Sequence, residues 1–138
     1  MAEKNEVCES FNRLFWHDSK LRAFHLFHRD DVDDLVMDIE LISGVERKHV
    51  PMAIVFEAIA FFICDMDVDG KRVCSDDISS AGCYAESDLK TEIQKERLQY
   101  EPDSLRDYFH FSFSLCPPGG SINVIAAGFK LVPSAPEP

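Results

Sequence analysis

Residues 105–132, LRDYFHFSFSLCPPGGSINVIAAGFKLV, decide the fold of this chain. In the first half, apolar and polar side chains alternate, which is typical of a strand with one buried face. Residues 117–120 supply turn chemistry, and the second half is again apolar. We predict a β-hairpin whose four-residue turn sets Leu115 opposite Ile122 and Phe113 opposite Val124. Each buried Phe contributes roughly 1.5–3 kcal/mol, so this hairpin is the expected folding nucleus.

The flanking sequence predicts two helices and a second hairpin. Apolar residues recur at helical spacing over residues 3–15, and Ser87 stands where an N-cap is expected for a helix over 88–99. Alternating apolar residues predict strands over 21–28 and 35–41, joined by a polar turn at 29–33.

The run from Met52 to Cys64 is apolar on both alternating faces, apart from Glu57. A span of that kind predicts one central strand, bent at residues 58–60. A buried helix is the alternative, because Ala and Phe suit either structure.

Together these segments predict an α+β fold, with one antiparallel sheet of about five or six strands and two packed helices. A single domain is expected over residues 1–132. The Pro-rich end, residues 133–138, is expected to be a disordered tail.

The charge balance is strongly acidic. Fourteen Lys and Arg face twenty-five Asp and Glu, which gives a net charge of −11. Phosphate-rich partners would be repelled, so we expect neither nucleic-acid nor membrane binding. A basic protein partner would suit this charge.

The cysteines predict a reducing compartment. All five are widely spaced, and none forms a C-x-x-C pair. An odd number at such spacings fits reduced thiols better than a disulfide framework. The charged start of the chain shows no signal peptide, and no apolar run is long enough to span a membrane. We therefore expect a cytoplasmic protein.

An acidic cluster occupies the first hairpin turn and gives the candidate partner surface. Its four members are Asp30, Asp31, Asp33 and Asp34. Such a run is most often plain solvated surface. It also fits a surface that attracts and covers a positively charged protein.

A second acidic stretch, Asp65-x-Asp67-x-Asp69-Gly70, matches the first half of a calcium loop. Carboxylates at alternate positions converge there on one cation. The second half departs from the pattern, since Arg72 replaces an apolar residue and Asp76 stands where a bidentate Glu is expected. The alternative interpretation is an Asp-Gly hairpin turn with solvated carboxylates.

The segment Trp16-His17-Asp18-Ser19 resembles the opening of small bacterial proteins with an aromatic-His-Asp-Ser signature. Some of those proteins are similar to the immunity proteins that accompany polymorphic toxins. The resemblance implies a non-enzymatic binding protein and assigns no catalytic residues. From the residues alone, we expect Asp18 or Ser19 to hydrogen-bond the backbone at a helix-to-strand junction, with Trp16 packed below.

These observations predict a non-catalytic, acidic protein-binding module that occludes a basic partner, and the resemblance implies that the module is immunity-like. The alternative is a calcium- or small-ligand-binding domain that uses Asp65, Asp67 and Asp69. Whether the protein is an enzyme stays uncertain, leaning towards no, because no nucleophile, base and orienting group can be placed together from the sequence. No cofactor is expected unless calcium binds.

Overall fold

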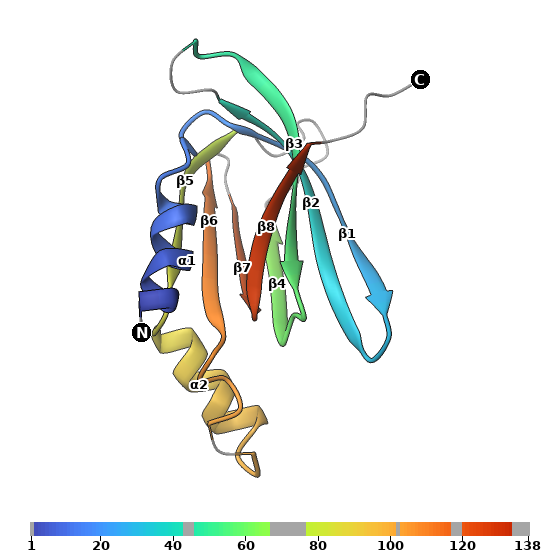
Figure 1. The fold of residues 1–138 in the computed structure, drawn as a ribbon, viewed down its shortest axis with the longest axis vertical. Helices are drawn as coiled ribbons and strands as arrows, with labels where there is room; N and C mark the ends of the chain where they lie inside the picture. Colours follow the sequence, from blue (N-terminus) through green and yellow to red (C-terminus); the bar gives the residue numbers. More distant parts are fainter. Residues whose placement is uncertain (1, 43–45, 67–76, 102, 117–119, 134–138) are drawn as a thin grey trace.

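The computed structural model describes residues 2–42, 46–66, 77–101, 103–116 and 120–133. Two helices and eight strands fall in these ranges (Figure 1). In chain order they are α1 (Ala2–Asn12), β1 (Lys20–Arg29), β2 (Val32–Ile42), β3 (His49–Glu57), β4 (Phe61–Met66), β5 (Ile78–Tyr84), α2 (Asp88–Arg97), β6 (Phe109–Leu115), β7 (Gly120–Ala126) and β8 (Gly128–Pro133).

The strands form two antiparallel four-stranded sheets. One has the order β1-β2-β3-β8, and the other has the order β4-β7-β6-β5. Strand makes up 57% of the structure and helix 15%, so the fold is mainly β. The prediction of one sheet of five or six strands with two packed helices is therefore wrong. The error arises because two apolar segments, residues 52–64 and 122–132, each have the composition of one strand but pass from one sheet to the other.

The first of these segments is the run from Met52 to Cys64. It is neither one strand nor a helix, since β3 belongs to the first sheet and β4 to the second. The break falls at the expected bend, where Ala58 has a φ of 51°. The second segment, residues 122–132, divides in the same way, since β7 belongs to the second sheet and β8 to the first.

The two crossings lie side by side, because β3 pairs with β8 and β4 pairs with β7. Hydrogen bonds continue across the corner, from the Ala60 N–H to the Ile125 carbonyl (2.7 Å) and from the Ala127 N–H to the Glu57 carbonyl (2.9 Å). A bent, two-stranded ribbon, in which β3 and β4 pair with β8 and β7, thus runs through both four-stranded sheets and joins them.

The hairpin of β6 and β7 forms as expected but in another register. Phe113 pairs with Ile122 and Phe111 with Val124, two residues from the predicted alignment. Gly120 is the reason, since it begins β7 opposite Leu115 instead of lying in the turn. Its φ of 152° favours glycine. A shift of two residues keeps each side chain on its predicted face.

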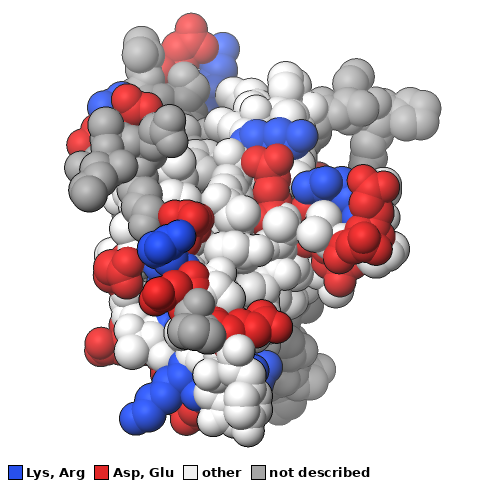
Figure 2. Space-filling view, turned by 60° about the horizontal axis from the view of Figure 1, so that its bottom comes forward, with Lys and Arg blue, Asp and Glu red and all other residues white. Residues whose placement is uncertain are grey.

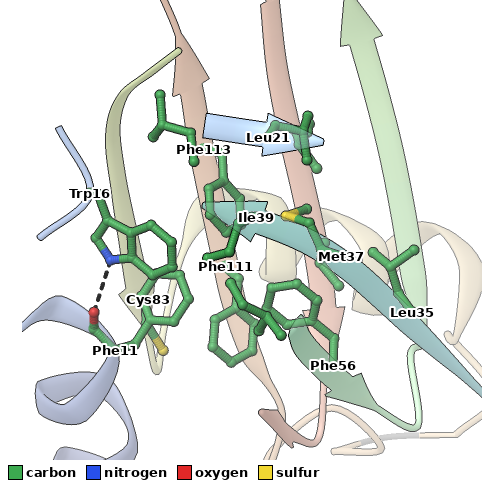
Figure 3. Packing of buried hydrophobic residues seen from close by; sticks show 14 of the residues in the cluster. Phe11, Trp16, Leu21, Leu35, Met37, Ile39, Phe56, Cys83, Phe111 and Phe113 are labelled. Carbon is green, nitrogen blue, oxygen red and sulfur yellow. Dashed lines mark hydrogen bonds between the residues drawn. The ribbon is translucent and has the colours of Figure 1, made fainter. Parts of the chain in front are cut away.

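The core fills the space between the sheets, and Figure 3 shows its aromatic centre. Phe11 of α1 is fully buried there against Phe111, with ring centroids 5.1 Å apart. Phe56 of β3 contacts the same ring from the other sheet, at 4.9 Å. The helix therefore supplies part of the core itself.

Both predicted helices are present, and both are slightly shorter than expected. α1 ends at Asn12, not at Phe15, and α2 ends at Arg97. The predicted N-cap is confirmed, since the Ser87 hydroxyl accepts a hydrogen bond from the Lys90 N–H (3.1 Å). Ile93 of α2 packs with Leu105 and Ile125 on the outer face of the second sheet.

Pro133, the first residue of the predicted tail, is the last residue of β8 and pairs with Met52. Residues 134–138, the rest of the predicted tail, lie outside the described residues. Within the described ranges, neither helix is long and apolar enough to cross a membrane.

Candidate functional site

The segment Trp16–Ser19 joins α1 to β1 and is structural. The indole Nε1 of Trp16 donates to the Phe11 carbonyl (2.9 Å), which ties the segment to the end of α1. The buried Ser19 hydroxyl donates to the Phe15 carbonyl (2.8 Å) and accepts from the Ile42 N–H (3.0 Å). The predicted junction role is confirmed for Ser19. This hydroxyl is fully used in holding the backbone.

The same region covers the outer edge of β5, which is an edge strand of its sheet. The Asn12 side chain donates from Nδ2 to the Cys83 carbonyl (3.3 Å), and its Oδ1 accepts from the Cys83 N–H (2.9 Å). Further along, Ile78 exchanges backbone hydrogen bonds with Asp18 and Ser19. The Asn12 amide thus pairs with this edge as a neighbouring strand would.

The outer edge of β1 is different. Among the described residues, β1 pairs with a second segment only at Lys20, which bridges to Asp77. Towards the hairpin tip its apolar side chains stay exposed: Phe24 by 36%, Leu26 by 58% and Phe27 by 57%. A long, apolar edge strand of this kind is a template for pairing with another chain. Figure 1 shows the β1–β2 hairpin on the flank opposite α1.

Asp34, one of the four predicted partner-binding residues, is committed to the fold. Its carboxylate accepts from Arg29 Nε (2.7 Å) and from the Ala58 N–H (2.9 Å), and the residue is only 6% exposed. These bonds hold the left-handed Ala58 at the corner between the sheets. The hydrogen bond from Arg29, more than the opposing effect of burial, keeps the pKa of Asp34 below its ordinary value.

The other three members of the cluster lie at the hairpin tip. Asp30, Asp31 and Asp33 are all exposed, and Asp30 takes the turn conformation with a φ of 48°. The Asp33 carboxylate bonds to His28 Nδ1 (2.7 Å), while its carbonyl accepts from the Ile59 N–H (2.8 Å). We call Asp30, Asp31 and Asp33 the acidic tip.

A groove begins beside the acidic tip. It has a volume of about 430 Å³ and is lined by Asp33, residues 59–63 and Arg97 of α2. The Arg97 guanidinium lies over the Phe61 ring, 5.2 Å from its centroid. Figure 2 shows acidic side chains gathered on the side of the β1–β2 hairpin, with an uncharged area between them and the mixed charges on the side of α2.

The calcium prediction remains a prediction. Asp65 is exposed at the end of β4, while Asp67 and Asp69 lie outside the described residues. Within the described part of the chain, no group of three His, Cys, Asp or Glu side chains is arranged to hold a metal ion.

Three polar side chains form a hydrogen-bonded chain on the outer face of the second sheet. His110 Nδ1 accepts from the Ser87 hydroxyl (2.8 Å), and its Nε2 donates to Asn123 Oδ1 (2.7 Å), in the tautomer that satisfies both bonds. These residue types also occur in hydrolytic triads. Here, however, the Ser87 oxygen caps α2 and His110 is buried, so the chain fixes the helix to the sheet.

The comparisons with known proteins found no match: no protein-family model, curated protein or solved structure is similar to this chain.

Sequence reasoning found the acidic tip but missed the groove and the open edge. The contact of Arg97 with the Phe61 ring depends on tertiary packing that residue spacing does not encode. The one available signal was the composition of β1, where Phe24, Leu26 and Phe27 place apolar side chains on both faces.

Proposed function

We propose that this protein is a non-catalytic protein-binding module whose binding side is the β1–β2 hairpin. Its partner is a basic protein, which is held by the acidic tip and covered by the hairpin. The observation that carries the proposal is that the exposed apolar edge of β1 runs into three exposed carboxylates.

The two parts have different roles. Leu26 and Phe27 offer apolar area for an extended segment of the partner, which adds to the sheet by strand pairing. Asp30 and Asp31 attract Lys or Arg side chains and raise the association rate, as complementary charge generally does. The groove beside Asp33 accepts one protruding partner side chain, with the Phe61 ring and Arg97 as its contacts.

The mechanism is occlusion, which suits the non-enzymatic binding protein that the resemblance implies. A module that covers a partner's working surface needs no reaction of its own. A cytoplasmic location fits this role, and among the described cysteines none is in a disulfide.

The test uses two variants with equal change in charge. Asp30→Lys with Asp31→Lys alters the acidic tip, while Glu92→Lys with Glu96→Lys alters exposed positions of α2. Basic proteins captured on immobilised wild type at low salt are purified, and their affinity for each protein is measured at several salt concentrations. We expect the tip variant to bind at least about tenfold more weakly, with a shallower salt dependence, and the α2 variant to match the wild type.

Equal loss in both variants would reduce the effect to net charge and contradict the proposal. Unchanged binding by the tip variant would contradict it as well. Asp34 is left intact in both variants because its substitution would disturb the corner between the sheets.

A further inference from the structure

Two cysteine thiols meet where α1 packs against β5. The Sγ atoms of Cys8 and Cys83 lie 3.3 Å apart, although the two residues are 75 positions apart in the sequence. Cys8 is half-buried in α1, and Cys83 is 2% exposed. A disulfide joins its sulfur atoms at about 2.05 Å, so closing this pair needs an approach of roughly 1.3 Å.

The backbone around the pair is already fixed. Asn12 lies four residues after Cys8 and therefore on the same face of α1. It bonds both the N–H and the carbonyl of Cys83. Phe11, from the same turn of the helix, is anchored in the core. The helix thus holds Cys8 next to Cys83 in the folded protein.

We propose that Cys8 and Cys83 form a redox site that is oxidised by small-molecule disulfides such as glutathione disulfide. The thiolate of the accessible Cys8 attacks one sulfur of glutathione disulfide, forms a mixed disulfide and releases glutathione thiolate. Cys83 loses its proton to solvent and attacks Cys8 Sγ, which releases the second glutathione thiolate. Both released thiolates are protonated, so two protein thiols are oxidised and one disulfide is reduced to two thiols.

The order of attack follows from the surroundings of each thiol. Burial, and then the hydrogen bond to Cys8, raise the pKa of the Cys83 thiol. The thiolate is the attacking species, so Cys83 is the resolving cysteine. The resulting disulfide links α1 covalently to β5. It lowers the conformational entropy of the unfolded chain and so stabilises the folded state.

The experiment incubates the reduced, folded protein in glutathione buffers of rising oxidised fraction. The remaining thiols are alkylated, and the mass of the intact protein gives the number of alkylated thiols and of bound glutathiones. Disulfides are then located by mass spectrometry of the digested peptides. We expect the wild type to lose two of its five thiols, those of Cys8 and Cys83, and to gain at least about 5 °C in Tm.

Three variants make the result specific. The double variant Cys64→Ser, Cys116→Ser keeps the pair and is expected to behave like the wild type. Cys8→Ser is expected to form no disulfide and show no Tm gain. Cys83→Ala is expected to retain one glutathione on Cys8, and the Tm of its reduced form verifies that it is folded.

A disulfide that maps to other cysteines would overturn the proposal. So would a folded wild type that keeps all five thiols in buffers that oxidise the urea-unfolded chain.

Discussion

β5 and β1 are both edge strands, yet only one of them is closed by the rest of the described chain. On β5, Asn12 satisfies the outward N–H and carbonyl of Cys83, and α1 lies along the strand. On β1, from Phe24 to the hairpin tip, the described residues supply no second strand or side-chain amide. Of these two edges, α1 covers that of β5, while that of β1 is left open by the described residues.

The difference teaches how an edge strand can be used. A helix that carries one amide and one large aromatic both fills the core and completes the strand's hydrogen bonds. An edge without such a cover is a liability for self-association unless a partner occupies it. We interpret the open edge of β1 as the working side of the molecule and the covered edge of β5 as its structural side.

The largest expected effect comes from replacing one Phe by Ala on each side of the molecule, first in α1 and then in β1. Phe11→Ala removes a ring that contacts Trp16, Phe111, Phe113 and Phe129 in the core. We expect a loss of about 3–5 kcal/mol in the free energy of unfolding, measured by urea denaturation.

Phe27→Ala is the matched control, since that ring is 57% exposed on β1. A loss below about 1 kcal/mol is expected for it. Similar losses for both variants would mean that the β1 side is packed as tightly as the α1 side, contrary to the comparison.

The next effect concerns Asp34, which anchors the base of the open hairpin. Asp34→Asn removes the charge that pairs with Arg29 and weakens the bond to the Ala58 N–H. We expect a loss of roughly 2–3 kcal/mol at neutral pH, measured by denaturation across pH.

The sign of the pH dependence follows from the lowered pKa of Asp34. The stabilisation is complete above the unfolded-state pKa of about 3.9 and is lost as the pH falls through the lower folded-state pKa. The two proteins should therefore converge in stability in strong acid. A constant difference down to the acid limit would assign the effect to packing instead of charge.

A smaller effect is expected at the amide that closes β5. Asn12→Ala leaves the Cys83 N–H without its partner, which should cost about 1–2 kcal/mol and speed exchange of that amide hydrogen. Asn12→Asp keeps an acceptor for the N–H but loses the donor to the carbonyl, so it should retain much of the amide protection. Equal exchange of the Cys83 amide in wild type and Asn12→Ala would show that the edge is closed by something other than this side chain.

The smallest effect on stability is expected on the open edge itself. Phe27→Lys should change the free energy of unfolding by less than about 0.5 kcal/mol, because the ring is largely exposed. It should, however, reduce self-association at high protein concentration, as measured by light scattering, because charges on an edge strand oppose pairing. Unchanged scattering with a lowered stability would contradict an open edge.

Much of the local structure could be predicted from the sequence. The alternation over 21–28 and 35–41 correctly predicted the β1–β2 hairpin, and Ser87 correctly marked the start of α2. The division into two sheets could not be read in the same way. A strand that passes through a corner keeps its apolar composition on both sides, so nothing in residues 52–64 shows that β3 and β4 have different neighbours.

The candidate site was predicted only in part. Aspartates in a turn predict a charged surface, and Asp30 and Asp31 are indeed exposed. The sequence could not show that Asp34 turns back to hold Ala58, because that bond joins residues 24 positions apart. The closure of β5 by Asn12 was likewise hidden, since an Asn near a helix end is equally compatible with a plain surface position.

Hydrogen exchange of the native protein, resolved by amide, tests the contrast between the two edges most directly. We predict strong protection of the Cys83 amide and an alternating pattern over residues 23–29, in which every second amide exchanges rapidly because it faces away from β2. Uniform protection over residues 23–29, or a Cys83 amide that exchanges as fast as the unprotected amides of β1, would contradict the account.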